Sequence, residues 1–275
     1  MLELRNVRFS YSRDQAIVVK DVSLQLAQGE FVAVAGRNGS GKTTLTKLMM
    51  SLLKPTAGQI LYDGRDTVSC SPADMARYIG YVFQNPDRQM FRDTVAAEIA
   101  YGPEQLGFPP EKVHRVVDEA METVGITFLA ARYPRTLSKG LKQKVAVASA
   151  LAMEPAVLIL DEPTSGQDVR TRELFMQLLT RLRQAGKTII LVTHDMDCLV
   201  RYAQRVIVMA DGEKAFDGPV AEFFATCQQV ESLGLREPAA VKISRGLSHQ
   251  GIPLTTDAVA LGQRIQQRKG GEIHA

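Results

Sequence analysis

The 275-residue chain is 45% hydrophobic and 23% charged, an ordinary balance for a soluble globular protein with one large or two modest domains. Its net charge of +3 is too small to indicate nucleic-acid binding, its three cysteines have no metal or redox spacing, and no apolar run approaches the length of a membrane span. We therefore expect a cytoplasmic chain with reduced cysteines, for which any role at a membrane depends on a partner.

The first 30 residues predict strands. The segments LELRNVRFSY (residues 2–11) and DVSLQLA (residues 21–27) alternate apolar and polar side chains, which is the period of a half-buried strand. We expect a small antiparallel β subdomain to precede the rest of the fold.

From residue 31 onward, short apolar runs alternate with helical patterns. The apolar runs, which are typical of buried parallel strands, are Phe31–Ala35, Ile79–Phe83, Val157–Leu160, Ile189–Val192 and Val206–Met209. The helical patterns follow Lys42, extend from Val113 to Val124 and span Thr171–Gln184. This alternation predicts an α/β fold with a doubly wound, parallel-sheet core.

Two segments depart from this alternation. Residues 93–150 lack a central strand, which predicts a helical subdomain inserted into the core. Beyond residue 218, glycines separate two narrow apolar stripes, which predicts a small helical appendix at residues 219–275 after a domain of residues 1–218. The stripes are Ala240, Ile243 and Leu247, then Ala258, Leu261 and Ile265. Pro219 and Pro238 fit the first turns of helices.

The segment FVAVAGRNGSGKTTL, residues 31–45, carries the strongest chemical signal. It places the pattern G-x-x-x-x-G-K-T after an apolar strand and before a helix. Glycines let the backbone curl so that N–H groups face a phosphate, the lysine can reach the terminal phosphates, and the threonine hydroxyl can bind Mg²⁺. We therefore predict a phosphate loop rather than an ordinary glycine-rich turn. Its nucleotide-binding residues are Gly36, Arg37, Asn38, Gly39, Ser40, Gly41, Lys42, Thr43 and Thr44.

A second strand, in AVLILDEPTSGQD, ends in two carboxylates. Ligands bind outside the carboxyl ends of strands in an open α/β sheet. Asp161 is thus placed to hold Mg²⁺, and Glu162 to orient or deprotonate an attacking water. Taken alone, the pair could equally be two solvated carboxylates, but beside a phosphate loop the catalytic interpretation is favoured.

His194 and Gln84 follow two further apolar strands, in LVTHDMD and YVFQNPDRQMF. A lone histidine after a strand is usually structural. Here the same sheet edge would place His194 near Lys42 and Glu162, which favours a contact with the terminal phosphate. Gln84 can touch the metal or the water; the alternative is an ordinary loop, because Asn-Pro-Asp follows it as a turn signal.

The stretch LSKGLKQKVA, residues 137–146, leaves two interpretations open. Ser138 can cap the start of a helix. Alternatively, the free N–H groups at that helix start can bind an anion. The residues alone do not decide between them.

Together these segments resemble the ATP-binding cassette (ABC) family over residues 1 to about 220. In that family, a serine–glycine signature binds the γ-phosphate of an ATP held by another subunit's phosphate loop. The signature residues here are Ser138, Lys139, Gly140 and Leu141. The resemblance also implies that Tyr11 stacks on adenine and that Asp168 communicates between the two sites. The implied cofactors are ATP and Mg²⁺, and the implied metal-binding residues are Thr43, Gln84 and Asp161.

A narrower resemblance is to the energy-coupling factor ATPases, which drive vitamin and metal-ion uptake. It is carried by Q-N-P-D-x-Q at residues 84–89 and by the tail ESLGLREPAAVKISRGLSHQGIPL at residues 231–254. It implies a second ATPase subunit, identical or homologous, that docks on the appendix. A transmembrane coupling protein and a separate substrate-binding membrane protein are also implied, with this chain at the cytoplasmic face of the membrane. No nucleic-acid partner is expected.

The signature departs from the family pattern Leu-Ser-Gly-Gly-Gln. Lys139 replaces a glycine and Leu141 replaces a glutamine. These changes keep open an alternative, a regulatory or non-transport ABC ATPase with low turnover. A cassette protein of DNA repair or translation would require long coiled coils or a second cassette, and the sequence shows neither.

Overall fold

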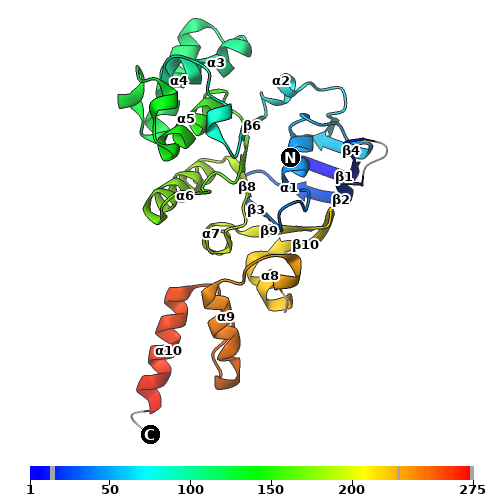
Figure 1. Ribbon diagram of the computed structural model, residues 1–275, viewed down its shortest axis with the longest axis vertical. Coiled ribbons are helices and arrows are strands. Elements are labelled where there is room, and N and C mark those ends of the chain that lie inside the picture. The colour runs from blue at the N-terminus through cyan, green and yellow to red at the C-terminus, as the bar shows by residue number, and fades with distance from the viewer. Residues whose placement is uncertain (13–15, 228–229, 273–275) are drawn as a thin grey trace.

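Two sheets of different character organise the protein (Figure 1). The computed structural model describes residues 1–12, 16–227 and 230–272. Within these residues, an antiparallel sheet has the strand order β2-β1-β4-β5, and a larger sheet has the order β10-β9-β3-β8-β7-β6. The strand pairs of the larger sheet are parallel except for β9 with β10. This is the predicted α/β fold with an antiparallel subdomain.

The antiparallel sheet consists of β1 (Leu2–Phe9), β2 (Val19–Leu26), β4 (Ala57–Tyr62) and β5 (Arg65–Asp66). Its first two strands confirm the alternating pattern of the first 30 residues, since they bury mainly their apolar side chains. The strands β4 and β5 were not predicted. The reason is that β4 buries only Ile60 and Leu61, too few side chains for a recognisable period.

The larger sheet consists of β3 (Phe31–Ala35), β6 (Ile79–Val82), β7 (Val157–Asp161), β8 (Thr188–Val192), β9 (Arg205–Ala210) and β10 (Glu213–Pro219). All five apolar runs predicted as strands lie in it, with boundaries that differ by at most one residue. The strand β10 was not predicted because none of its side chains is fully buried. β3, β7 and β8 are buried along their whole length, as expected for the centre of a sheet covered on both faces.

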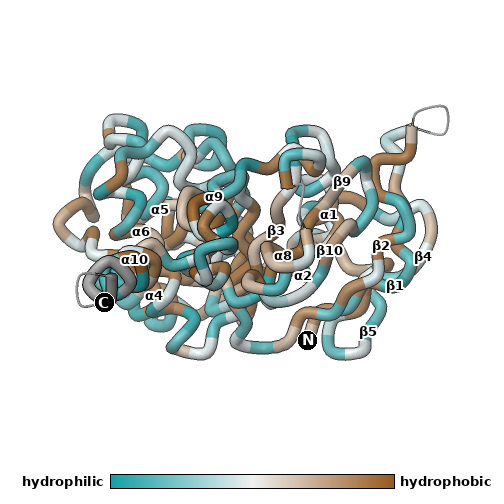
Figure 2. Tube along the Cα trace, turned by 90° about the horizontal axis from the view of Figure 1, so that it is seen from below, coloured by the Kyte–Doolittle hydropathy of each residue, from teal (hydrophilic) through white to brown (hydrophobic). Residues whose placement is uncertain are grey.

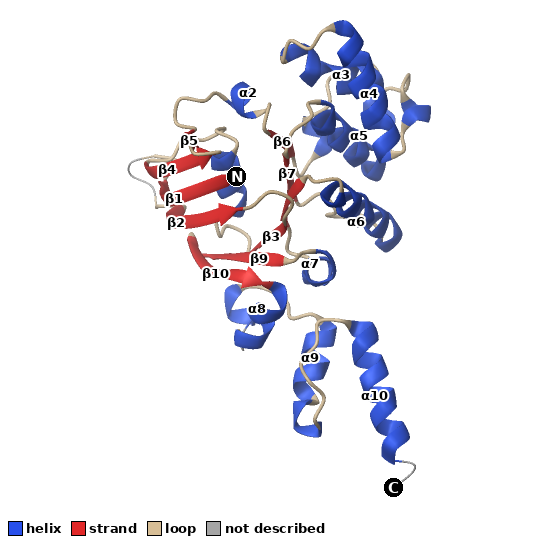
Figure 3. Cartoon of the chain, turned by 180° about the vertical axis from the view of Figure 1, so that it is seen from behind, coloured by secondary structure: helices blue, strands red, loops and turns tan. Residues whose placement is uncertain are grey.

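Helices flank this sheet and form the inserted subdomain (Figure 3). The α-helices up to residue 202 are α1 (Lys42–Met49), α2 (Pro72–Met75), α3 (Val95–Gln105), α4 (Pro110–Val124), α5 (Lys139–Ala152), α6 (Val169–Gln184) and α7 (Met196–Tyr202). Short 3₁₀ turns are η1 (Pro86–Arg88), η2 (Thr127–Leu129) and η3 (Pro134–Thr136). The helical subdomain is α3 to α5, and the predicted apolar face of α4 is buried there. Among the described residues, no helix is both long and apolar enough to cross a membrane.

The C-terminal segment contains α8 (Val220–Thr226), η4 (Val230–Leu233), α9 (Ala239–Gly246), η5 (Ser248–Gln250) and α10 (Ala258–Glu272). Its first part packs on the larger sheet, because Phe223 and Phe224 share a buried cluster with Ala33 and Ala35 of β3. Only α9 and α10 project beyond the sheet (Figure 1). Both expected first-turn prolines instead stand one position earlier, as N-caps of α8 and α9.

The two apolar stripes of the appendix pack against each other. Ala240 of α9 and Leu261 of α10 form a small buried cluster with Ile252, and Leu247 and Ile265 pack against it. Four of the six stripe residues thus cover one another, whereas Ile243 and Ala258 stay exposed. Apolar side chains remain exposed beside this cluster, at Ile243 and Val259. Figure 2 shows α9 and α10 from their free end.

Candidate functional site

The sheet order brings the predicted site residues to one edge. β3 leads into the phosphate loop, and its neighbours β8, β7 and β6 follow in that order. Parallel strands end at the same edge, so the residues that follow β8, β7 and β6 line up beside the phosphate loop. These residues are His194, Glu162 and Gln84, and all three line one cavity of about 700 Å³ together with Lys42.

The phosphate loop is shaped as an anion cradle. A Cβ atom added to Gly36 would lie 2.2 Å from the carbonyl oxygen of Met209 and 2.6 Å from the hydroxyl of Ser40, so only glycine fits there. Gly41 has a left-handed φ of 100° and directly precedes α1. The buried hydroxyl of Ser40 has no hydrogen-bond partner within the described residues. A phosphate oxygen at this helix start would meet free N–H groups and this hydroxyl, so the loop fits ATP.

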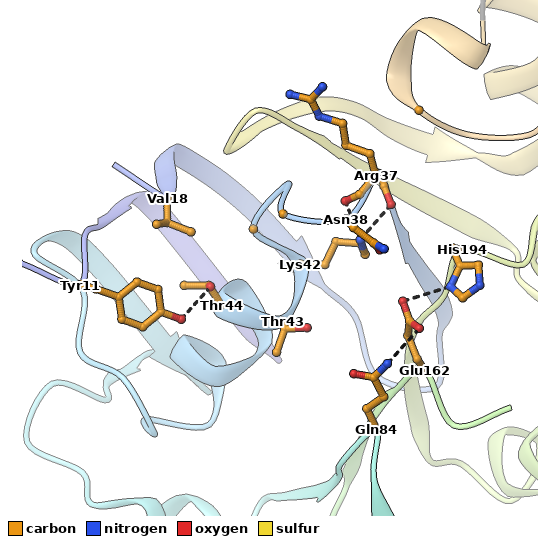
Figure 4. A pocket seen from close by; sticks show the side chains of 14 residues that line it. Tyr11, Val18, Arg37, Asn38, Lys42, Thr43, Thr44, Gln84, Glu162 and His194 are labelled. Carbon is orange, nitrogen blue, oxygen red and sulfur yellow. Dashed lines mark hydrogen bonds and ion pairs between the residues drawn. The ribbon is translucent and has the colours of Figure 1, made fainter. Parts of the chain in front are cut away.

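Lys42 is held across the loop. Its ammonium donates to the carbonyl oxygens of Gly36 at 2.8 Å and Arg37 at 2.9 Å (Figure 4). Burial lowers the pKa of Lys42 from its ordinary value, while the carboxylates of Glu162 and Asp161 oppose that shift. The ammonium is thus partly desolvated and aimed by two carbonyls, which suits it to a multiply charged phosphate chain.

Asp161 lies behind the cavity rather than in its wall. It is 4% exposed, and the hydroxyl of Tyr81 donates to it at 3.4 Å. Burial raises the pKa of Asp161, although its hydrogen bond with Thr43 lowers it. Among the described residues no group of three or more His, Cys, Asp or Glu could hold a metal alone. One carboxylate beside a threonine hydroxyl instead fits Mg²⁺ that is shared with substrate phosphates.

Glu162 has a partner on each of its two carboxylate oxygens. Nδ1 of His194 lies 3.1 Å from one of its oxygens, and Nε2 of Gln84 donates to the other at 3.4 Å (Figure 4). The carboxylate is 13% exposed, while the imidazole is 60% exposed and points into the cavity. Two donors on opposite oxygens fix the carboxylate without neutralising it, which is what a general base requires.

Tyr11 and Thr44 form the other end of the cavity. The hydroxyls of Tyr11 and Thr44 lie 3.1 Å apart, and the Tyr11 ring packs edge-on against Phe9. The Tyr11 ring is 56% exposed, and Val18 lines the cavity next to it. An exposed, oriented aromatic ring beside a phosphate loop is suited to stacking on a base.

The predicted signature and inter-site residues do not line this cavity. Ser138 is the N-cap of α5, with its hydroxyl accepting from the amide of Leu141 at 3.5 Å. Asp168 is the N-cap of α6, and its carboxylate accepts from the amide of Thr171 at 2.9 Å. The two helix starts touch, because a Cβ added to Gly140 would lie 2.8 Å from the Thr171 side chain. Both therefore belong to a surface separate from the chain's own phosphate loop.

Three features of the site were not predicted from the sequence. Tyr81 links Asp161 to Thr46 of α1, and burial raises its pKa. Lys139 donates to the carbonyl of Ser165 in the loop before α6. Gly234 lines the cavity from the C-terminal segment. A polar ring inside an apolar strand was a usable signal for Tyr81, but nothing local marked the other two.

Comparison with known proteins decides the family. A family model described as "ABC transporter" matches residues 19–165. The chain belongs to the ABC transporter family. It thus has an ABC ATPase domain, the domain that binds ATP with Mg²⁺ and hydrolyses it.

Individual relatives support the narrower resemblance. The chain is 36% identical to the "Energy-coupling factor transporter ATP-binding protein EcfA1" of Clostridioides difficile, over 97% of this chain and 98% of that one. A similar solved structure is cbiO1 from Clostridium perfringens, which is described as part of the ABC transporter complex cbiONQ. The two have a TM-score of 0.76 and 35% sequence identity, and the match covers 86% of this chain and 94% of cbiO1.

A second solved structure is the dimeric cassette MJ0796 bound to ADP and Pi. It has a TM-score of 0.71 and 30% identity, covering 80% of this chain and 99% of that one. Some relatives are much longer than this chain. The chain spans about two fifths of the length of two putative ABC transporter ATP-binding proteins from Methanosarcina, to which it is 41% identical.

Proposed function

We propose that the chain is the ATP-hydrolysing subunit that powers an energy-coupling-factor-type importer of a vitamin or metal ion. The observation that carries the proposal is the carboxylate of Glu162, held between His194 and Gln84 in the cavity that the phosphate loop lines. This arrangement supports hydrolysis rather than nucleotide binding alone, because it fixes a base beside a phosphate site.

Each residue has a role that follows from its position. The amides of the phosphate loop and the ammonium of Lys42 bind the phosphates of ATP and stabilise the negative charge that develops on them during transfer. Thr43 and Asp161, with Gln84 beside them, would hold Mg²⁺, which supplies further positive charge at the phosphates. Tyr11 stacks on the adenine base, so the chain binds ATP at both its phosphate end and its adenine end.

Glu162 orients a water and accepts its proton. The contact from Nδ1 of His194 sets the direction of one carboxylate oxygen, and in the imidazolium form the other ring nitrogen, Nε2, would donate to the terminal phosphate. Gln84 orients the other oxygen. Gln84 begins the loop that contains η1, so a movement of that loop would change the hydrogen bond that Gln84 donates to Glu162. A partner that moves the loop could in this way change the rate of hydrolysis.

The importer type and its partners rest on the resemblance and on the two relatives named above. EcfA1 and cbiO1 are both described as transporter components, and both align over nearly their full length. We propose a second ATPase subunit, identical or homologous, as the partner that contacts Ser138–Leu141 and Asp168. A transmembrane coupling protein and a substrate-binding membrane protein complete the assembly, with this chain at the cytoplasmic face.

The test combines co-purification with transport. The chain is purified from membranes with its associated proteins, which are identified, and ATP hydrolysis is measured with and without them. An Asp87→Asn variant is expected to keep basal hydrolysis and to lower uptake, because Asp87 in η1 pairs with Lys142 of α5 at 2.6 Å and ties the loop of Gln84 to the helical subdomain. Asp118→Asn, an exposed carboxylate on α4, is the matched control.

A second candidate is a regulatory ABC ATPase with low turnover. The observation that favours it is Lys139, whose ammonium binds Ser165 of the same chain instead of leaving the signature free for a partner's phosphate. Hydrolysis that stays slow in the presence of all membrane partners would support this candidate over the transporter.

A further inference from the structure

The C-terminal segment touches the phosphate loop at one point. Gly234, directly after η4, has a left-handed φ of 69°. A Cβ atom added to Gly234 would lie 2.5 Å from Cβ of Arg37 and 3.4 Å from the next two carbons of that side chain. The close atom is the one attached to the Arg37 backbone, so rotating the side chain would not relieve such a contact. In Figure 4 the C-terminal ribbon runs close to the labelled Arg37.

Arg37 is directly connected to the groups that bind phosphate. Its carbonyl oxygen accepts from the ammonium of Lys42 at 2.9 Å and from the amide of Ser40 at 3.2 Å. Its guanidinium pairs with Asp211 in the turn between β9 and β10. A displacement of Arg37 would therefore move the acceptor of Lys42 and the turn that carries the unpartnered hydroxyl of Ser40.

The segment that presents Gly234 is anchored on the strand that leads into the phosphate loop. Val230 and Leu235, on either side of Gly234, are buried in the cluster that includes Ala33 and Ala35 of β3. The amide of Gly234 donates to the carbonyl of Glu231 at 2.9 Å, which closes the turn. The contact with Arg37 thus joins two pieces of backbone that are each held in place.

A second cavity borders this turn. It has a volume of about 630 Å³ and separates the start of α9 from the segment around His194. Gly234 and His194 line this cavity as well as the nucleotide-binding one. Because Val241 of α9 shares the buried cluster with Val230 and Leu235, a displacement of α9 would act on the turn of Gly234.

We infer that Gly234 is a positioning residue of the nucleotide site: its bare backbone seats Arg37 and so links the location of the appendix to the affinity of the phosphate loop for ATP. This role of Gly234 rests on the proposed function, which supplies ATP as the ligand of the phosphate loop. By thermodynamic linkage, whatever displaces the appendix weakens ATP binding, and bound ATP holds the appendix in place.

The test measures binding rather than hydrolysis. The 275-residue chain is titrated with the ATP analogue AMP-PNP and Mg²⁺ by calorimetry, as wild type, Gly234→Ala and Gly186→Ala. Gly186 is the matched control, because it also has a left-handed φ, 91°, but a Cβ there would meet nothing within 4 Å. We expect Gly234→Ala to raise the dissociation constant about tenfold and Gly186→Ala to leave it unchanged.

A double-mutant cycle assigns the effect to Arg37. Arg37→Gly removes the carbon that the new Cβ would strike, so the loss caused by Gly234→Ala should shrink in that background. If Gly234→Ala alone does not fold, the double variant is expected to fold and to bind as Arg37→Gly does. A reciprocal readout is amide exchange at residues 230–241, which the bound analogue should slow.

The outcomes distinguish the role of Gly234 from the function of the whole chain. A wild-type chain that fails to bind the analogue would overturn the proposed function and the role of Gly234 together. Wild-type binding with equal affinities for Gly234→Ala and Gly186→Ala would overturn the role of Gly234 alone. An undiminished loss in the Arg37→Gly background, an unfolded double variant, or unchanged amide exchange would also overturn it.

Discussion

Glu162 combines an unfavourable backbone with a well-supported side chain. Its φ of 47° lies in the left-handed region, which is uncommon for a residue other than glycine. The amide of Glu162 donates to the carbonyl of Val192 at 2.9 Å, and the carboxylate has His194 and Gln84 as partners. The strained turn aims the carboxylate out of the sheet edge and into the cavity, where the phosphate loop lies.

We expect Glu162→Gln to lower ATP hydrolysis by about 10²- to 10⁴-fold, the usual contribution of a general base. Nucleotide binding should persist, because the amide keeps the shape of the side chain and Lys42 is untouched. Lys42→Ala is the contrasting variant and should weaken binding itself. ATP hydrolysis and nucleotide binding are measured side by side for both variants. Near-normal hydrolysis by Glu162→Gln would show that Glu162 is not the general base.

Asp161 and Asp168 should respond to pH with opposite signs in the nucleotide-free protein. Burial raises the pKa of Asp161, so ionising it costs folding free energy as the pH rises through the ordinary aspartate range. The hydrogen bonds of Thr171 lower the pKa of Asp168, so the stability that it contributes is present at neutral pH and lost as the pH falls. Asp161→Asn is therefore expected to raise the melting temperature at pH 7, and Asp168→Asn to lower it.

Thermal unfolding between pH 2 and pH 8 tests this pair. The difference caused by Asp161→Asn should shrink as the pH falls to the ordinary aspartate range, whereas the difference caused by Asp168→Asn should persist there and shrink only at lower pH. A melting temperature of Asp161→Asn below that of the wild type at pH 7 would show that the contacts with Tyr81 and Thr43 outweigh the cost of burial.

At the scale of elements, the starts of α5 and α6 act as one unit. Lys139 of α5 bonds to the carbonyl of Ser165, and Gly140 packs on Thr171 of α6. A glycine at position 139 would release this link and bring a bare backbone to the helix start. Lys139 therefore has two effects at the signature: it adds bulk where the family pattern has a glycine, and it hydrogen-bonds the signature to Ser165 of the same chain.

We expect Lys139→Gly combined with Leu141→Gln to raise turnover at the partner's ATP site by about tenfold, a change of about 1.4 kcal/mol in the barrier. The reason is that the two substitutions free the signature and restore a polar side chain. The assay is ATP hydrolysis by the assembled complex, with Glu162→Gln in this chain so that only the partner's site turns over. No increase, or a decrease, would mean that the lysine is a functional substitute.

At the scale of the whole molecule, the appendix has two surfaces. One packs on the larger sheet through α8 and Val241. The other carries α9 and α10, which cover each other and leave Ile243 and Val259 49% and 69% exposed. Deleting all residues after 218 would remove the appendix and also expose the core residues of the larger sheet that α8 covers. Point substitutions are therefore the cleaner probe of association.

We expect Ile243→Glu with Val259→Glu to shift the chain toward the monomer in the absence of nucleotide, because charges would replace apolar contacts at the proposed interface between ATPase subunits. Sedimentation velocity measures the shift. Val68→Glu, at a residue that is 62% exposed in a different part of the molecule, is the control. Identical profiles for all three proteins would exclude this face of the appendix as an interface.

Local spacing determined much of what was predicted. The five buried strands are continuous apolar runs, and the phosphate loop depends on glycines within a few residues of Lys42, so both are visible without the fold. Asp161, Glu162, His194 and Gln84 were predicted because parallel strands end at a common edge. Weakly buried strands such as β10 carry no such pattern, because a half-exposed edge strand does not constrain its side chains to a period.

The tertiary structure alone decided the contacts between distant segments. Tyr81 meets Asp161, Lys139 meets Ser165 and Gly234 meets Arg37, over separations of 80, 26 and 197 residues along the chain. Each contact depends on where whole elements pack, and one side chain or one missing Cβ leaves no periodic trace in the sequence. Hydrophobic periodicity sets which elements form and which face they bury, whereas the geometry of the packed sheet sets which loops share a site.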